Sequence, residues 1–245
     1  MRIHGICSYN GTNYSGWQKQ TNETSIQEEI EKVLSTIFNT PTNIQGSGRT
    51  DALVHAYNQH FHFEVNDDKK VDLERLKYSM NSMLPNDIEI KSLEVVDNDW
   101  HARFSAKGKR YIYKVKTLAK DPFNDHLAWL NPEPFDYDLL CKSLLLFKGE
   151  HDFKSFTSKE EDDNNFIRVI DDITVTKQGN DISIFFVGNG FMRYQIRFMV
   201  GTAFAVATKD IDISYITTRL DSGVKRDITH YKAPGQGLYL DEVFY

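Results

Sequence analysis

The chain has 245 residues, 40% of them apolar, and a net charge of −6, a composition typical of a folded protein with one large or two small domains. Its two cysteines, Cys7 and Cys141, provide no disulfide framework and no metal-cluster spacing, so we expect a reducing, cytoplasmic environment. No apolar run approaches the roughly 20 residues of a membrane helix, and residues 1–5 lack the pattern of a secretion signal.

Hydrophobic periodicity in the first part of the chain predicts strands interrupted by two helices. The expected strands are 3–9, 43–46, 57–65 and 88–96, and the expected helices are 25–38 and 73–83. Thr24 is expected to be the N-cap of the first helix, with Gln27 completing a capping box. Pro85 is expected to end the second helix.

Strand 57–65 carries two different faces. Phe61 and Phe63 lie on one face, and His60 and His62 lie on the other. We expect these two histidines at the surface or facing RNA. A metal site formed with His55 is disfavoured because no cysteine lies nearby.

The second part of the chain repeats this rhythm without a detectable sequence repeat. Its expected strands are 110–116, 167–176, 182–187 and 237–244, and its expected helices follow Asp136 as far as Gly149 and cover 192–207 and 213–220. Segment 154–166 is polar and acidic and is the expected flexible insertion. The pattern predicts an α+β protein with helices packed on a mainly antiparallel sheet, built from two similar halves, 1–105 and 106–245.

Positive charge is concentrated in one segment despite the acidic total. Residues 101–120 contain no Asp or Glu but hold Arg103, Lys107, Lys109, Arg110, Lys114, Lys116 and Lys120. Phe104, Tyr111 and Tyr113 are interleaved with these cations, which favours a nucleic-acid track over a merely solvated strand face.

The segment Gly48-Arg49-Thr50-Asp51-Ala52 places a carboxylate and a guanidinium two residues apart between two expected strands. Such a loop can hold an ionised carboxylate as a nucleophile. Taken alone, Asp51 is better explained as a turn-forming residue in a glycine-rich loop. Gly46-Ser47-Gly48 lacks the Gly-Lys-Ser/Thr ending of a phosphate loop, so an NTPase is not expected.

Four ordered blocks resemble the tRNA pseudouridine synthase A (TruA) family. They are GTNYSGWQ at 11–18, GRTDA at 48–52, HARFSA at 101–106 and GNGFM at 188–192, the last continuing as IRFMVG at 196–201. Smaller matches are LPNDI at 84–88, HDF at 151–153 and GLYL at 237–240. Together the blocks cover nearly the whole chain.

The resemblance implies a fold and a reaction. It implies the pseudouridine-synthase fold, with an active-site cleft between the two halves and a homodimer as the working form. It also implies an isomerase that converts uridine to pseudouridine at positions 38 to 40 of the tRNA anticodon stem-loop. Such enzymes break a glycosidic bond, rotate the flipped base and rejoin it through carbon, without metal, ATP or redox cofactor.

The resemblance also implies residue roles. Asp51 aligns with the catalytic aspartate, Tyr111 with the active-site tyrosine, and Arg197 with the electrostatic partner of the aspartate. Arg49, Lys107, Lys109, Arg110 and Arg193 are expected to contact substrate, mostly through phosphates. Tyr113 shares a strand face with Tyr111, so the choice between these tyrosines rests on the resemblance.

Leu53 departs from the family pattern, which has glycine at this position. Leucine here implies either an ordinary φ or a strained backbone. The departure leaves open a second hypothesis, a catalytically impaired RNA-binding protein or tRNA chaperone of the same fold. A third is a pseudouridine synthase with a different RNA target.

Overall fold

The computed structural model describes residues 1–66, 71–158 and 165–245. Two compact units divide the chain: residues 1–107 with 239–245, and residues 108–238. The last strand therefore belongs with the first unit although it comes from the far end of the sequence.

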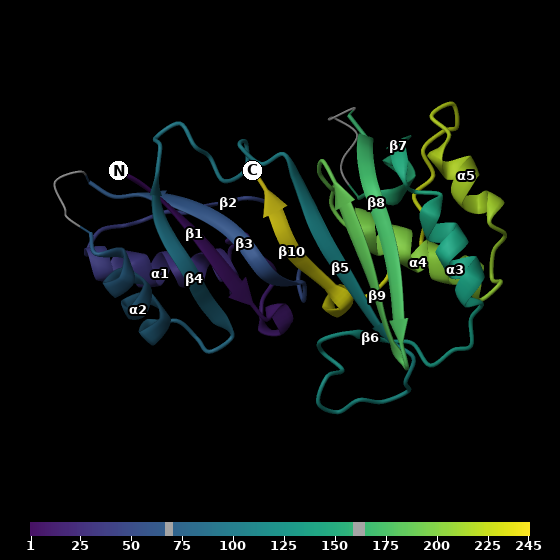
Figure 1. The fold of residues 1–245 in the computed structure, drawn as a ribbon, viewed down its shortest axis with the longest axis horizontal. Coiled ribbons are helices and arrows are strands. Elements are labelled where there is room, and N and C mark those ends of the chain that lie inside the picture. Colours follow the sequence, from purple (N-terminus) through teal and green to yellow (C-terminus); the bar gives the residue numbers. More distant parts are fainter. Residues whose placement is uncertain (67–70, 159–164) are drawn as a thin grey trace. The chain divides into compact units, whose positions relative to one another are not determined.

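In the part of the chain that the structure describes, the first unit has mainly antiparallel strands and two helices. Its elements are β1 (Arg2–Tyr9), the 3-10 turn η1 (Gly11–Asn13), α1 (Ile26–Phe38), β2 (Gln45–Gly46), β3 (His55–Glu64), α2 (Leu73–Met83), β4 (Ile88–Val96) and β10 (Leu238–Phe244). The strand order is β4-β1-β3-β10, with β2 also paired to β3. β1 runs antiparallel to both neighbours, whereas β10 runs parallel to β3. Figure 1 shows α1 and α2 together on one face of this sheet.

Helix α1 begins one residue later than the capping pattern predicted. Its N-cap is Ser25, whose extended backbone lets the side-chain oxygen accept a hydrogen bond from the Glu28 amide. The prediction of Thr24 as N-cap is therefore wrong, because Ser25 and Glu28 stand in the same spacing one residue on. Apolar residues of α1, such as Ile30 and Leu34, are fully buried.

The histidine face of β3 is not a solvent face. Phe61 and Phe63 are buried in the core, but His60 and His62 are 5% and 4% exposed. The rings of Trp100 and Tyr245 cover them, with centroids of His62 and Trp100 6.0 Å apart and those of His60 and Tyr245 5.1 Å apart. The expectation of surface or RNA-facing histidines is wrong, because alternation alone does not reveal what covers the second face.

Within its described residues, the second unit consists of mainly antiparallel strands and three helices. Its elements are β5 (Gly108–Lys116), β6 (Trp129–Leu130), α3 (Tyr137–Leu145), β7 (Gly149–Asp152), η2 (Lys154–Phe156), β8 (Ile167–Gln178), β9 (Asp181–Gly188), α4 (Gln195–Ala207), α5 (Ser214–Leu220) and η3 (Gly235–Gly237). The strand order is β5-β9-β8-β7 with antiparallel neighbours, and β6 pairs parallel to β5. The α+β class with mainly antiparallel strands is confirmed in both units.

Helix α4 is the central helix of the second unit. Every residue of α4 except Arg197 is buried, and the helix packs against α3. A helix that is apolar on nearly all sides is expected in a core. It begins at Gln195, later than predicted, because Tyr194 adopts a left-handed backbone conformation.

Segment 154–166 is not one flexible insertion. Residues Lys154–Phe156 form η2, and the side chains of Ser155 and Phe156 are buried. Residues 159–164 lie outside the described part of the chain. Gly149 does not close α3, which ends at Leu145; it begins β7 with a φ of +108°.

Candidate active site

Asp51 lies in the loop between β2 and β3 of the first unit, and that loop is anchored on the residue before it. The carbonyl oxygen of Thr50 accepts a hydrogen bond from the Trp17 amide at 3.1 Å. The hydroxyl groups of Thr50 and Tyr9 lie 2.8 Å apart. Thr50 is buried, whereas Asp51 is half-buried. The loop therefore fixes the backbone while leaving the carboxylate partly accessible.

Buried polar side chains anchor the start of the same loop. Gln59 is fully buried on β3, and its amide group donates to the carbonyl oxygen of Gly48 at 2.9 Å. Its side-chain oxygen accepts from the Ser47 hydroxyl at 2.7 Å. These bonds replace backbone pairing that an irregular segment cannot form.

Leu53 resolves the choice left by the sequence. Its φ is +68°, in the left-handed region, and its side chain is 40% exposed. A leucine in this region is strained, because its Cβ crowds the backbone. The position thus keeps the conformation that a glycine would adopt without strain.

Arg49 and Lys107, which the sequence analysis expects to contact substrate, are exposed cations of the first unit. Arg49 precedes the buried Thr50 and points outward, as its exposure shows. Lys107 follows the HARFSA block, and its amide donates to the Phe244 carbonyl at 2.8 Å. Both positions are open to a polyanion.

Tyr111 and Tyr113 on β5 have different surroundings. The Tyr113 hydroxyl donates to the carbonyl oxygen of Pro234 at 2.7 Å, and the side chain is fully buried. Burial raises the pKa of Tyr113 well above its usual value. Tyr111 packs edge-on against Phe191, with ring centroids 5.2 Å apart. The hydroxyl of Tyr113 is thus already bound in the core, whereas Tyr111, also buried at 7% exposed, stays the candidate that the resemblance implies.

The two cations beside Tyr111 lie on opposite faces of β5. The register pairs Lys109 with Gly188, Arg110 with Val187 and Tyr111 with Phe186. Because side chains alternate along a strand, Lys109 shares the face of Tyr111 and Arg110 lies on the other. The basic segment is therefore divided between two surfaces.

Arg197 lies in the first turn of α4 and is tied to the segment that follows α5. Its Nε donates to the carbonyl oxygen of Ala233 at 2.8 Å, and its own carbonyl accepts from the Ala233 amide at 2.9 Å. Gly201, one turn on, permits this approach, because a Cβ there would lie 2.7 Å from the Tyr231 oxygen. These two hydrogen bonds tie Arg197 to the segment that follows α5.

Two residues near Arg197 were missed by the sequence analysis. They are Tyr194 and Lys232, and the Lys232 Nζ lies 4.6 Å from the centroid of the Tyr194 ring. Arg193 and Arg197 also lie over this ring. Arg193 is exposed. No sequence signal distinguishes Lys232 from other lysines.

The histidines singled out as a weak metal candidate have separate partners. His55 Nδ1 accepts from the Gly11 amide at 3.0 Å, and His62 Nδ1 accepts from the Ala102 amide at 3.2 Å. His60 Nδ1 lies 2.9 Å from His4 Nε2. Among the described residues, no group of three or more His, Cys, Asp or Glu side chains could hold a metal ion.

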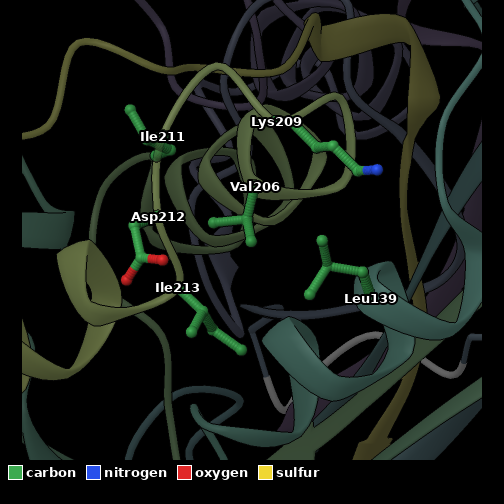
Figure 2. A pocket seen from close by; sticks show the side chains of 6 residues that line it. All are labelled: Leu139, Val206, Lys209, Ile211, Asp212 and Ile213. Carbon is green, nitrogen blue, oxygen red and sulfur yellow. The ribbon is translucent and has the colours of Figure 1, made fainter.

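A pocket of about 370 Å³ lies at the far end of α4 from Arg197. It is lined by Leu139, Val206, Lys209, Ile211, Asp212 and Ile213. Figure 2 shows the charged ends of Lys209 and Asp212 pointing away from each other. Val206 lies nine residues after Arg197, about 14 Å along a helix. The pocket is therefore distinct from the surroundings of Arg197.

Comparison with known proteins decides the family. A family model described as tRNA pseudouridine synthase matches residues 6–105 and 144–245. The chain belongs to the tRNA pseudouridine synthase family. The matched residues include Asp51 and Arg197, whereas Tyr111 lies in the unmatched stretch between them.

Full-length relatives support this membership. The tRNA pseudouridine synthase A of Lactococcus lactis subsp. cremoris (strain SK11) is 36% identical over 100% of this chain and 97% of its own length. The protein of that name from Exiguobacterium sp. (strain ATCC BAA-1283 / AT1b) is 37% identical over 100% and 98%, and that from Staphylococcus aureus (strain MRSA252) is 33% identical over 100% and 92%. The resemblance to the tRNA pseudouridine synthase A family is thus confirmed. None of the described helices is long and apolar enough to cross a membrane.

Proposed function

We propose that this tRNA pseudouridine synthase acts on uridines 38 to 40 of the anticodon stem-loop, with Asp51 as its catalytic carboxylate. The supporting observation is the anchoring of Thr50, which holds the backbone beside a half-buried carboxylate. A carboxylate held in this way can attack the sugar or the pyrimidine ring, or stabilise a cationic intermediate. Isomerisation needs no net supply of electrons or water, because the same base is detached and rejoined.

Arg197 would act on Asp51 through charge. A guanidinium favours the ionised form of a carboxylate and orients it through charge-assisted hydrogen bonds. The bond from Nε to Ala233 supports this role, because it restricts the position of the guanidinium. Tyr111 would stack on the flipped uracil and assist proton transfer.

The remaining cations would hold the RNA backbone. Exposed Arg49, Lys107 and Arg193 can each reach a phosphate without first leaving a buried site. Lys109 shares the face of Tyr111, so its phosphate would lie near the flipped nucleotide, whereas Arg110 would contact RNA from the other face of β5. Binding to phosphates should therefore contribute much of the affinity for tRNA.

The deciding experiment compares wild type with Asp51→Asn on an unmodified tRNA transcript that has uridines in the anticodon arm. The substitution keeps the shape of the side chain and removes its charge. We expect product from wild type, none from Asp51→Asn, and a tRNA dissociation constant within about threefold for the two proteins. Product formation by Asp51→Asn would overturn the assignment of this residue. Mapping the modified positions in the product tests the anticodon assignment separately.

A catalytically impaired RNA-binding protein is the alternative that Leu53 suggests. The positive φ of Leu53 favours an active enzyme, because the backbone at this position keeps the left-handed conformation that the family's glycine can adopt. Leu53→Gly should relieve strain of roughly 1 kcal/mol, partly offset by the greater freedom of glycine in the unfolded chain. Activity that appears only in Leu53→Gly would identify the natural chain as impaired.

The working form that we propose is a cytoplasmic homodimer. The net charge of −6 supports this, because two copies would present two sets of cations to one polyanion. Cys7 and Cys141 are both free thiols, as a reducing compartment requires. Light scattering at assay concentration checks the dimer, and a monomeric mass would contradict it.

A further inference from the structure

The strongest unexplained feature near Arg197 is the backbone of Tyr194. Its φ of +61° and ψ of +4° lie in the left-handed region, immediately before the first residue of α4. A bulky residue is rarely found there, and glycine or asparagine would adopt the conformation at lower cost. A large aromatic ring at such a position suggests that the ring itself is needed.

Hydrogen bonds on both sides of Tyr194 hold this conformation in place. The carbonyl oxygen of Arg193 accepts from the Thr157 hydroxyl at 3.0 Å and from the Ser158 amide at 3.3 Å. The side-chain oxygen of Gln195 accepts from the Met192 amide at 2.9 Å, and the Gln195 amide donates to the Met192 carbonyl at 3.1 Å. A strained residue persists where its surroundings determine its conformation in this way.

Three cations surround the ring that is fixed by this backbone. Arg193 Cζ lies 4.9 Å, Arg197 Cζ 5.0 Å and Lys232 Nζ 4.6 Å from the ring centroid. Arg193 Nη2 also donates to the Tyr194 hydroxyl at 3.2 Å. All three lie within the range of cation–π attraction. The ring is therefore a shared partner for cations that come from α4, from the loop before it and from the segment after α5.

An aromatic ring and a carboxylate hold a guanidinium in different ways. The first turn of α4 contains no acidic residue. The ring quadrupole attracts a cation without neutralising its charge or occupying all of its N–H donors. The ring therefore adds an attraction for cations at the N-terminal end of α4, where the helix dipole disfavours them.

We propose that Tyr194 is a positioning residue for Arg197: its ring, held by a strained backbone, fixes the guanidinium in the orientation used in the reaction. The Ala233 carbonyl restrains Arg197 at Nε, and the ring restrains it at the guanidinium carbon. This inference rests on the role proposed above for Arg197. It adds a residue that acts on the reaction only through that arginine.

The test compares Tyr194→Gly and Tyr194→Phe with wild type in steady-state pseudouridine formation on the tRNA transcript. Tyr194→Gly removes the ring and relieves the backbone strain, so the thermal unfolding midpoint should stay the same or rise. Its kcat should nevertheless fall by about tenfold or more, with KM changed by less than about threefold, because a misplaced catalytic group costs turnover. Tyr194→Phe keeps the ring and should retain kcat within about threefold. A residue with a purely structural role would not lower kcat while stability is kept.

A double-mutant cycle with Arg197→Lys shows whether Tyr194 acts through the arginine. In the Arg197→Lys background, Tyr194→Gly should lower kcat by less than about twofold further, because the orientation that the ring provides is already lost. Losses that multiply would overturn the inference, as would full kcat in Tyr194→Gly or an equally large loss in Tyr194→Phe. Wild-type kcat in Arg197→Lys, or an inactive wild type, would instead overturn the proposed function together with the inference.

Discussion

Gly16 lies so close to Thr50 that a Cβ atom on Gly16 would come within 2.5 Å of the Thr50 carbonyl oxygen. Gly16 also has a φ of +100°, which side chains rarely permit. The same oxygen accepts the hydrogen bond from the Trp17 amide. The backbone directly before Asp51 is therefore positioned by a glycine more than thirty residues earlier, in a block that carries no catalytic group of its own.

Gly16→Ala should displace this loop. The added methyl group meets backbone atoms that cannot rotate away, and the φ of +100° adds strain. We expect a loss of about 2 kcal/mol or more in the free energy of unfolding and at least about tenfold in kcat. Urea denaturation and pseudouridine formation measure the two effects.

Gly223→Ala is the matched control. A Cβ there meets a side-chain oxygen of Asp221 at 3.3 Å, which can move aside. Its effect on stability and kcat should be small. Equal losses in the two variants would show that the contact with Thr50 is not what matters.

Local patterns predicted most elements because each depends on residues close in sequence. The alternation from Ile88 to Val96 gave β4 with its observed bounds, and Gly179 joins β8 and β9 with a φ of +60°, as a hairpin turn requires. The α+β class followed from the succession of these elements. The family blocks identified Asp51 and Arg197 as candidates without any knowledge of their surroundings.

Features that depend on distant residues could not be predicted. The burial of His60 and His62 is produced by Trp100 and Tyr245, which the alternation of β3 does not reveal. The contact of Lys232 with Tyr194 joins residues 38 positions apart in number, and neither carries a sequence signal. The left-handed conformation of Tyr194 could not be predicted either, because a tyrosine is normally expected to have a negative φ.

The two tyrosines of β5 should respond differently to substitution. Tyr113→Phe removes the hydrogen bond to the Pro234 carbonyl and should cost about 1 kcal/mol in stability with kcat nearly unchanged. Tyr111→Leu removes a ring proposed to stack on the base and should lower kcat by about a hundredfold or more, since proton transfer by such a group contributes 10² to 10⁴. Thermal unfolding and product formation separate the two outcomes. The reverse pattern would assign the catalytic role to Tyr113.

Binding of tRNA should depend on salt through exposed arginine and lysine side chains. Arg49→Gln removes an exposed cation and should weaken binding while lowering the slope of log affinity against log salt by about one. Fluorescence anisotropy with labelled tRNA over a range of salt concentrations measures both. Lys32→Gln is the control, because Lys32 pairs with Glu28 and Glu29 on α1. The same change of slope in both variants would mean that the total charge matters and not the position of Arg49.

Acid should destabilise the first unit through its buried histidines. Burial lowers the pKa of both His60 and His62 to about 4, and it also lowers the pKa of His4, which lies against His60. The charged groups around this cluster are Glu94 beside His4, Glu242 and Lys91 near His60, and Arg2, Glu64 and His101 near His62. Between the ordinary histidine pKa and about 4, the unfolded chain therefore binds protons that the folded chain excludes.

The free energy of unfolding should accordingly be constant above about pH 6.5 and fall as the pH is lowered toward 4. Each of His60 and His62 should contribute on the order of 1 to 2 kcal/mol to this loss. His60→Gln removes one titrating group, so its stability should depend less on pH over this range, even if it is lower at neutral pH. Urea denaturation at pH 7, 5.5 and 4.5 makes the comparison. His126→Gln, at a side chain 40% exposed, should follow wild type. An unchanged pH dependence in His60→Gln would show that acid acts on the unit elsewhere.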